Sequence, residues 1–161
     1  MSSTSKSRHT WREKMDKVQE PRLVDTPPKW HKQFGPGKML IATPSLVDSL
    51  MRKAPRGKLL TVRQIRERLA KDYCASSTCP LTTGIFVRIA AEVAEEDMLA
   101  GRKDPTAYWR VVKDDGGLNE KFPGGVEEQA RRLKREGHVI KPGKGRKPPR
   151  VKAFEQALVA L

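Results

Sequence analysis

The residues able to form a hydrophobic core are few, and most of them lie in the middle of the chain. Leu, Ile, Val and Phe account for 34 of 161 residues, and 25 of these fall within residues 38–140. A highly charged chain with less than about 20% of such residues tends to stay disordered. We therefore expect one folded domain over residues 38–140, flanked by two arms that are poor in core residues, 1–37 and 141–161.

The positive charge is concentrated in these two arms. Of the net charge of +14, residues 1–37 carry +4 and residues 141–161 carry +5. Lys and Arg that neutralise phosphates release condensed counterions, so nucleic acid is the leading class of partner. The alternative is a ribosome-like or merely solvated basic surface. No stretch of 20 residues joins a strong apolar face to clustered cations, and we expect no membrane association.

Cysteine and histidine are too sparse to predict a metal site or a disulfide framework. Cys74 and Cys79 are the only cysteines, and the three histidines are widely spread. We expect reduced thiols, no metal and no cofactor. The sequence also has no apolar run near 18 residues and no apolar signal core at its N-terminus. These features predict a soluble protein that is cytoplasmic and nucleoid-associated, or nuclear in a eukaryote.

Helix signals recur through the middle of the chain. Thr43-Pro44 is an N-cap followed by proline at the first helical position. Thr61 and Gln64 have the spacing of a capping box, which predicts a second helix to about residue 72. After a loop over residues 73–81, a third helix opens near Thr82 or Thr83, with Ile85 at the start of an apolar stripe that we expect to face the core.

The second half of the chain predicts a small β element and a fourth helix. Residues 108–112 have β propensity and end in a turn, and a helix from residue 126 stops at Gly137. Residues 138–140 fit a closing strand, residues 141–152 a flexible cationic segment, and the last residues a short docked helix. The N-terminal arm is interrupted by prolines, but its aromatic residues predict that part of it packs on the domain. The expected fold is mainly α, a winged-helix-type domain with a small β element and basic N- and C-terminal arms.

Three segments in residues 44–140 together resemble one known family. Residues 55–65 have the form P-x-G-K-x-x-T-x-x-x-I, residues 107–112 are A-Y-W-R-V-V, and residues 124–137 have the form G-G…L-x-x-E-G. In this order they resemble the DNA-binding domain of the O6-alkylguanine-DNA alkyltransferases, and especially their catalytically dead relatives, the alkyltransferase-like proteins.

The resemblance implies a protein without enzymatic activity. It aligns Tyr108 with the nucleophilic Cys of the enzymes and Trp109 with the His that activates it. A phenol has an unperturbed pKa near 10 and lacks the nucleophilicity of a thiolate. Val62 stands where the family uses a Tyr that presses on the DNA backbone, which puts extrusion of a base in question.

The resemblance also implies the DNA contacts. The Arg that fills the stack vacated by an extruded base corresponds to Thr83 or Arg88, although Arg88 could instead face solvent and pair with Glu92. Thr61 and Arg63 are candidate phosphate contacts at the start of a helix. Arg110 corresponds to an Arg that is normally internal and structural. A DNA contact is the second role that we consider for it.

The lesion pocket implied by the resemblance comprises four residues. Tyr108, Trp109, Phe122 and Pro123 would surround and stack on an exposed base. The alternative is that Tyr108 and Trp109 merely fill a collapsed pocket.

These features predict a monomeric, non-enzymatic protein that recognises alkylated or distorted double-stranded DNA and marks it for repair proteins. The alternatives are an alkyltransferase or base-processing enzyme with atypical residues, and a regulatory or nucleoid-type DNA binder without a lesion pocket. A pocket beside Tyr108 that is open to a base favours lesion recognition. A pocket filled by Trp109 or Phe122 favours plain DNA binding.

Overall fold

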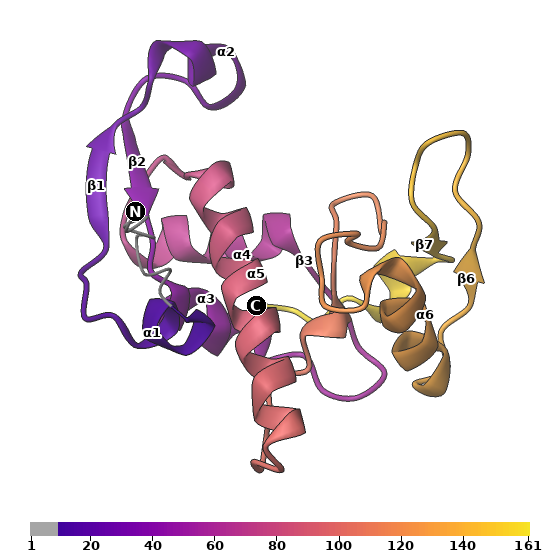
Figure 1. The fold of residues 1–161 in the computed structure, drawn as a ribbon. Helices are drawn as coiled ribbons and strands as arrows, with labels where there is room; N and C mark the ends of the chain where they lie inside the picture. The colour runs from indigo at the N-terminus through magenta and orange to yellow at the C-terminus, as the bar shows by residue number, and fades with distance from the viewer. Residues whose placement is uncertain (1–9) are drawn as a thin grey trace, which may run out of the picture.

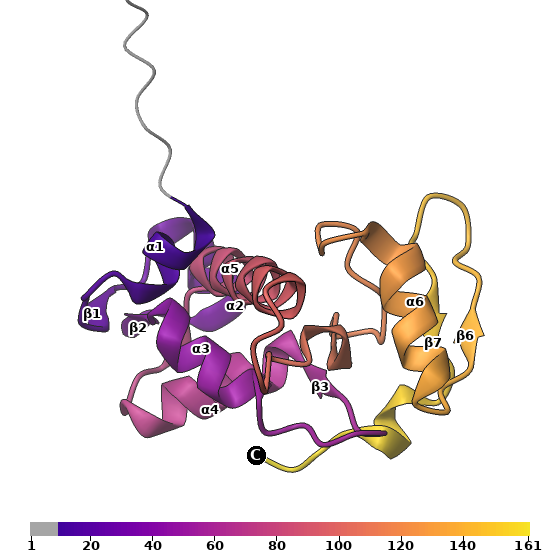
Figure 2. The same ribbon diagram turned by 60° about the horizontal axis from the view of Figure 1, so that its bottom comes forward.

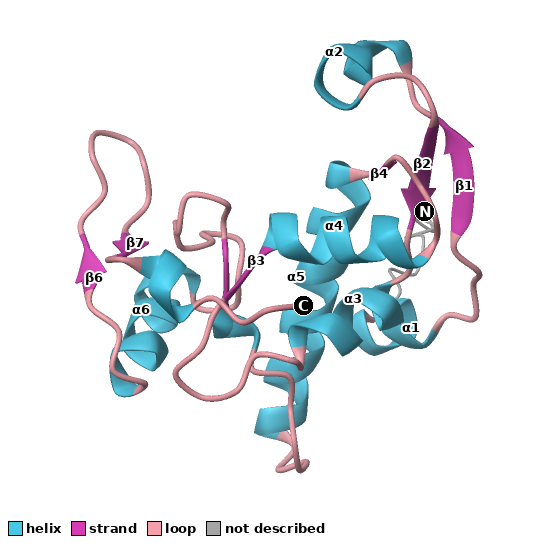
Figure 3. Ribbon diagram, turned by 180° about the vertical axis from the view of Figure 1, so that it is seen from behind, coloured by secondary structure: helices cyan, strands magenta, loops and turns pink. Residues whose placement is uncertain are grey.

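The computed structural model describes residues 10–161, so the first nine residues of the predicted N-terminal arm lie outside the described residues. The longest helix, α5, runs through the middle of the molecule (Figure 1). On one side of it lie α1 to α4 with a three-stranded sheet, and on the other lie α6 and a small hairpin (Figure 3). The fold is a mixed α/β arrangement in which helices predominate.

The helices are α1 (Trp11–Asp16), α2 (His31–Phe34), α3 (Pro44–Met51), α4 (Val62–Asp72), α5 (Pro80–Leu99) and α6 (Gly125–Arg135), with 3-10 helices at Pro28–Trp30, Tyr108–Arg110 and Phe154–Ala157. The strands are β1 (Arg22–Asp25), β2 (Lys38–Ile41), β3 (Leu60–Thr61), β4 (Ser77–Thr78), β5 (Val111–Val112), β6 (Ile140–Lys141) and β7 (Arg150–Val151).

The capping signals in the sequence are confirmed by hydrogen bonds. The Thr43 hydroxyl accepts from the backbone N–H of Leu46 at 3.3 Å, at the start of α3. At the start of α4, the Thr61 hydroxyl accepts from the Gln64 N–H at 3.1 Å, and the Gln64 side chain accepts from the Thr61 N–H at 2.9 Å. These bonds satisfy amide groups that the first turn of a helix leaves without partners.

Helix α5 begins earlier than predicted. Pro80 occupies its first turn and Cys79 is its N-cap residue. Proline fits this position because its fixed φ suits a helix and the missing N–H would have had no partner. The predicted loop over residues 73–81 also contains β4, which pairs in parallel with β2 and completes the order β1-β2-β4.

The β run predicted over residues 108–112 is a strand only in its last two residues. Residues 108–110 form a 3-10 helix with local bonds, such as Arg110 N–H to the Ala107 carbonyl at 3.1 Å. Val111 and Val112 then pair in parallel with Leu60 and Thr61. This local turn places the Tyr108 side chain in the core. A continuous strand through residues 108–112 would not by itself predict that position.

The C-terminal arm is more structured than predicted. Instead of a flexible segment, residues 140–151 form the β6–β7 hairpin, in which Ile140 pairs with Val151. The predicted terminal helix is a single 3-10 turn, Phe154–Ala157. Around its end, the backbone forms two hydrogen bonds with Leu59. The Leu59 N–H donates to the Ala157 carbonyl at 2.9 Å, and the Val159 N–H donates to the Leu59 carbonyl at 3.0 Å. The end of the chain is thereby tied to the domain.

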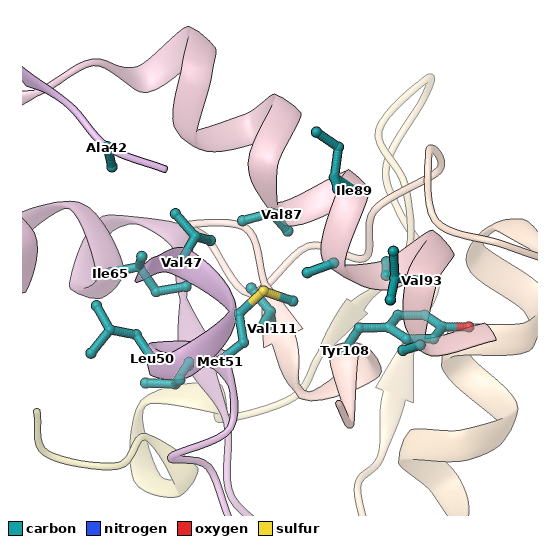
Figure 4. Close-up of a cluster of buried hydrophobic side chains, with 14 of the residues drawn as sticks. Ala42, Val47, Leu50, Met51, Ile65, Val87, Ile89, Val93, Tyr108 and Val111 are labelled. Carbon is teal, nitrogen blue, oxygen red and sulfur yellow. The ribbon is translucent and has the colours of Figure 1, made fainter. Parts of the chain in front are cut away.

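Two hydrophobic clusters hold these elements together. The larger packs α3, α4 and the inner face of α5 against the segment around Tyr108, and Figure 4 shows Tyr108 together with Met51, Val87 and Val111. The smaller cluster includes Leu59, Leu133 and Val151, and joins α6 to the C-terminal hairpin. Trp109 packs against both clusters.

Residues 10–161 contain neither a membrane-spanning helix nor a cluster of metal ligands. Within that range no helix is long and apolar enough to cross a membrane. The same residues bring no three His, Cys, Asp or Glu side chains together in a group that could hold a metal ion.

Candidate nucleic-acid interface

A cleft of about 780 Å³ lies along the outer face of the N-terminal half of α5. In Figure 2, α1 flanks α5 on one side, and the segment that follows β5 and leads to α6 lies across from it on the other. The cleft is lined by Trp11 and Lys14 of α1, Val62 and Arg66 of α4, Pro80, Leu81, Gly84, Ile85 and Arg88 of α5, and Lys113, Asp114, Asn119, Glu120 and Lys121 of the segment after β5.

The lining carries five cations and two carboxylates. Lys113 is bound to Glu120 at 3.0 Å, and Arg66 lies 3.4 Å from Asp114. Even with these two pairs counted, the cleft has an excess of positive charge. A concave surface with one predominant sign of charge concentrates counter-ions of the opposite sign, here polyanions.

Two large apolar side chains project from α5 at this cleft. Leu81 is 60% exposed and Ile85 is 57% exposed, one helical turn apart. Gly84 stands between them, and a Cβ built there would meet nothing within 4 Å. The expectation that Ile85 faces the core is wrong. The later part of the predicted stripe is confirmed, since Ile89, Ala90, Val93 and Ala94 are buried. The buried face of α5 also carries Thr83, Val87 and Ala91.

The start of α4 presents one of the two predicted phosphate contacts. The Arg63 side chain is 66% exposed and lies 3.9 Å from Glu67. Its backbone N–H donates to Asp114 at 2.8 Å. Thr61 is buried, and its hydroxyl is used in the capping box. The first turn of α4 is therefore already capped by this chain, which leaves the Arg63 side chain as the group facing outward.

Thr83 and Arg88, the two candidates for filling a vacated base stack, differ in their surroundings. Thr83 has no exposed surface, and its hydroxyl donates to the Cys79 carbonyl at 2.7 Å. Arg88 lines the cleft, where its guanidinium lies 5.3 Å from the centroid of the Trp11 ring. It also lies 3.9 Å from Glu92, the alternative partner expected from the sequence. Burial is the main reason that the pKa of Glu92 is raised.

The predicted lesion-pocket residues pack against one another. The Tyr108 ring lies 5.5 Å from Trp109 and 5.2 Å from Phe122, both in edge-to-face geometry. Tyr108 is only 1% exposed, and its hydroxyl lies 3.5 Å from the Pro123 carbonyl. The four residues are thus brought together, and the aromatic side chains fill the space between them.

Charged groups close this aromatic cluster from outside. The Tyr108 hydroxyl donates to Glu95 at 3.0 Å and accepts from Arg132 at 3.1 Å. The Arg132 guanidinium lies 4.9 Å from the Trp109 ring centroid and 5.5 Å from that of Tyr108. Burial raises the pKa of the Tyr108 phenol, and the nearby Glu95 raises it further, while Arg132 lowers it. The phenol is therefore kept neutral and is a poor nucleophile.

Arg110 is bound inside the molecule. Its Nε donates to both oxygens of Glu136, at 2.9 and 3.1 Å, and its Nη1 donates to the Ala54 carbonyl at 2.8 Å. The Arg110 side chain is 16% exposed. These contacts are those of an internal, structural arginine, because the guanidinium is held by groups of this chain.

The sequence reasoning did not find several residues of the cleft. Trp11 and Lys14 belong to the predicted arm, and Arg66 is one cation among many on an amphipathic helix. Leu81 and Ile85 could have been found, because they lie four residues apart and off the Val87–Ala91–Ala94 face. Two large apolar residues on the outer side of a helix are an interaction signal when they are adjacent.

The chain has a similar solved structure but no match by sequence. The sequence matches no known protein family and no curated protein. Among solved structures, the chain is similar to S. pombe Atl1, crystallised in complex with damaged DNA containing O6-carboxymethylguanine. The two chains are 15% identical, the alignment covers 73% of this chain and 94% of Atl1, and the TM-score is 0.49.

Proposed function

We propose that this protein binds double-stranded DNA without catalysing a reaction, and that the cleft beside α5 is its contact face. The observation that carries the proposal is the pairing of cations with two exposed apolar side chains in one cleft, on the outer face of a helix. Cations alone would fit any polyanion. Apolar side chains that project from a helix between flanking cations fit a groove with phosphates on both sides.

The roles divide between two sets of residues. Arg88 and Lys121 of the cleft neutralise phosphates, as does Arg63 at the start of α4, outside the cleft lining, and these contacts give affinity without reading sequence. Leu81 and Ile85 enter the groove, where Gly84 lets the sugar-phosphate backbone approach the helix closely. Apolar residues used in this way partly unstack a base step and kink the duplex.

A preference for alkylated or distorted DNA is the second part of the proposal. A wedge that unstacks bases works at lower cost where pairing is already weakened, so damaged sites are favoured. In this proposal the damaged base is bound in the cleft beside α5. The cluster of Tyr108, Trp109 and Phe122 is packed and therefore supports the core. If no preference is found, the regulatory or nucleoid-type binder without a lesion pocket is the function that remains.

The absence of catalysis is supported by the chemistry at residue 108. A buried tyrosine whose pKa is raised cannot replace a thiolate, and Trp109 has no basic nitrogen to activate it. Of the two cysteines, Cys79 is buried and Cys74 is exposed, outside the cleft lining. Marking of damage for repair proteins and a monomeric state remain expectations of the sequence resemblance.

The test is a fluorescence anisotropy titration of a labelled duplex at several salt concentrations. Three duplexes would be compared: a matched one, one with a central O6-alkylguanine, and one with a central mismatch. The double variant Leu81→Ser/Ile85→Ser should lose most of any preference for the altered duplexes while keeping a salt-dependent affinity. If the affinity of the unmodified protein for the duplexes does not change with salt concentration, the proposal is overturned.

A further inference from the structure

Helix α1 brings an aromatic residue from the N-terminal arm to the wall of the cleft. The helix is capped by the Thr10 hydroxyl, which accepts from the Glu13 N–H at 3.1 Å. It is held on α5 by an ion pair between Arg12 and Asp97, and by Met15, which is buried in the core. These contacts fix the position of Trp11, which is partly buried and lines the cleft.

Two cations contact the Trp11 ring. Lys14 Nζ lies 4.5 Å from the ring centroid and the Arg88 guanidinium lies 5.3 Å from it. Both cations also line the cleft, as does the exposed apolar side chain of Ile85. An aromatic face beside cations and open to a basic groove is the arrangement that single-stranded nucleic-acid sites use to stack bases.

We propose that Trp11 is the stacking surface for one unpaired nucleobase of a bound nucleic acid. When DNA is bound, Lys14 and Arg88 exchange the indole ring for the phosphates on either side of that base, and the ring receives the base. The excess of cations in the cleft favours an anionic strand over an uncharged aromatic ligand. The volume of about 780 Å³ lies within the range of about 300–1,000 Å³ usual for small-molecule sites.

This inference rests on the proposed function, because the duplex delivers the base to the cleft. It also moves the site of base recognition. The resemblance implies a pocket at Tyr108, which is filled, whereas Trp11 comes from a segment that was predicted to be an arm. The unpaired base can come from a distorted duplex or from a single strand, and the experiment must separate these sources.

The experiment measures the affinity of Trp11 variants for three labelled DNAs of one sequence: a matched duplex, the same duplex with one bulged base, and the single strand. Trp11→Ala should weaken binding of the bulged duplex by about 5- to 150-fold, the range expected for loss of base stacking. Binding of the matched duplex should change by less than about 2-fold, since phosphate contacts carry it. If Trp11→Ala lowers the affinity for the single strand alone, Trp11 binds single-stranded DNA, and its proposed role in duplexes is overturned.

Trp30 provides a matched control. It is also a tryptophan of the N-terminal region with a lysine over its ring, Lys29 Nζ at 4.7 Å, but it is outside the cleft lining. Trp30→Ala should leave all three affinities unchanged. If the unmodified protein fails to bind the matched duplex in a salt-dependent way, the proposed function fails. If the unmodified protein binds, but Trp11→Ala lowers the affinity for the matched and the bulged duplex by the same factor, only this inference fails.

A spectroscopic measurement keeps the test valid if Trp11→Ala destabilises α1. A base stacked on an indole quenches its fluorescence. Bulged duplex should therefore quench the emission of the unmodified protein and of Trp30→Phe, and should quench that of Trp11→Phe much less. Equal quenching in Trp11→Phe and the unmodified protein would overturn the proposal.

Discussion

Trp109 donates its indole N–H to Oε2 of Glu136 at a distance of 2.6 Å. The same carboxylate accepts from Arg110 and from the backbone N–H of Gly57, the latter at 2.8 Å. Three segments that are distant in sequence are therefore joined at one carboxylate, which is only 4% exposed. The residue that the resemblance aligns with an activating His thus has a structural role in this chain.

The Glu136 carboxylate should make stability depend on pH in the acid range. Burial alone would raise its pKa, but hydrogen bonds from Arg110, Gly57 and Trp109 lower it overall, below the ordinary value of 4.5. The unfolded chain then binds a proton more readily than the folded protein. The free energy of unfolding should consequently fall as the pH drops from about 5 through the lowered pKa. Urea denaturation at a series of pH values measures this.

Glu136→Gln provides the decisive comparison for that prediction. It should lower the free energy of unfolding at neutral pH by about 3 to 5 kcal/mol, because the buried Arg110 loses its counter-charge. It should also flatten the acid dependence. Glu127→Gln, which removes an exposed carboxylate of α6, is the control and should do neither. An unchanged acid profile in Glu136→Gln would contradict the assignment.

Cations of the cleft should determine the salt dependence of DNA binding. Each lost phosphate contact should reduce the log–log slope of affinity against salt by about 0.9. Arg88→Ala and Lys121→Ala should each show this reduction. Arg102→Ala is the control, because Arg102 follows the opposite end of α5 and pairs with Asp97 at 3.2 Å. Equal slopes in all three variants would place the contact face elsewhere.

No methyl group should be transferred from DNA to this protein. Intact mass spectrometry after incubation with an O6-methylguanine duplex should show the unmodified mass, because Tyr108 is buried and neutral. Tyr108→Cys should not gain the activity, since Trp109 supplies no base to form the thiolate. A stable adduct of one methyl group would show that the protein is an enzyme.

Truncation of Tyr108 should affect stability rather than the recognition of DNA. Tyr108→Ala removes a ring packed on Trp109 and Phe122, and should cost about 3 to 5 kcal/mol of unfolding free energy. Tyr108→Phe keeps the ring and loses only the bonds to Glu95 and Arg132. Its ratio of affinities for alkylated and matched duplex, measured by anisotropy, should equal that of the unmodified protein. A selective loss on the alkylated duplex would restore the predicted lesion pocket at Tyr108.

The β6–β7 hairpin should contribute affinity that is independent of sequence. Replacing Lys144, Arg146 and Lys147 of its loop by Gln should weaken binding of every duplex by a similar factor. Deletion of residues 141–161 is a less suitable test, because it also removes buried Val151 and the backbone bonds to Leu59. That deletion should lower the melting temperature, whereas the triple Gln variant should not. A change in sequence preference would show that the hairpin contacts bases.

The sequence by itself determined the features that depend on neighbouring residues. The N-caps at Thr43 and Thr61 begin helices where the pattern predicted them, because capping bonds form within one turn. Helix α6 ends before Gly137 for a local reason too, because Gly137 has a φ of 96°, a conformation that glycine adopts readily. The absence of a thiol at residue 108 is likewise a property of the sequence alone, and it is the basis for expecting no alkyl transfer.

Only the tertiary structure decided which of these residues share a surface. Thr83 and Ile85 are two positions apart on one helix, yet one is fully buried and the other is exposed, since burial depends on what packs against each face. Tyr108 is closed in by Glu95 and Arg132 from two other helices, and Trp11 reaches the cleft through the docking of α1 on α5. Such contacts join residues far apart in the chain, and the packing of the whole domain determines them.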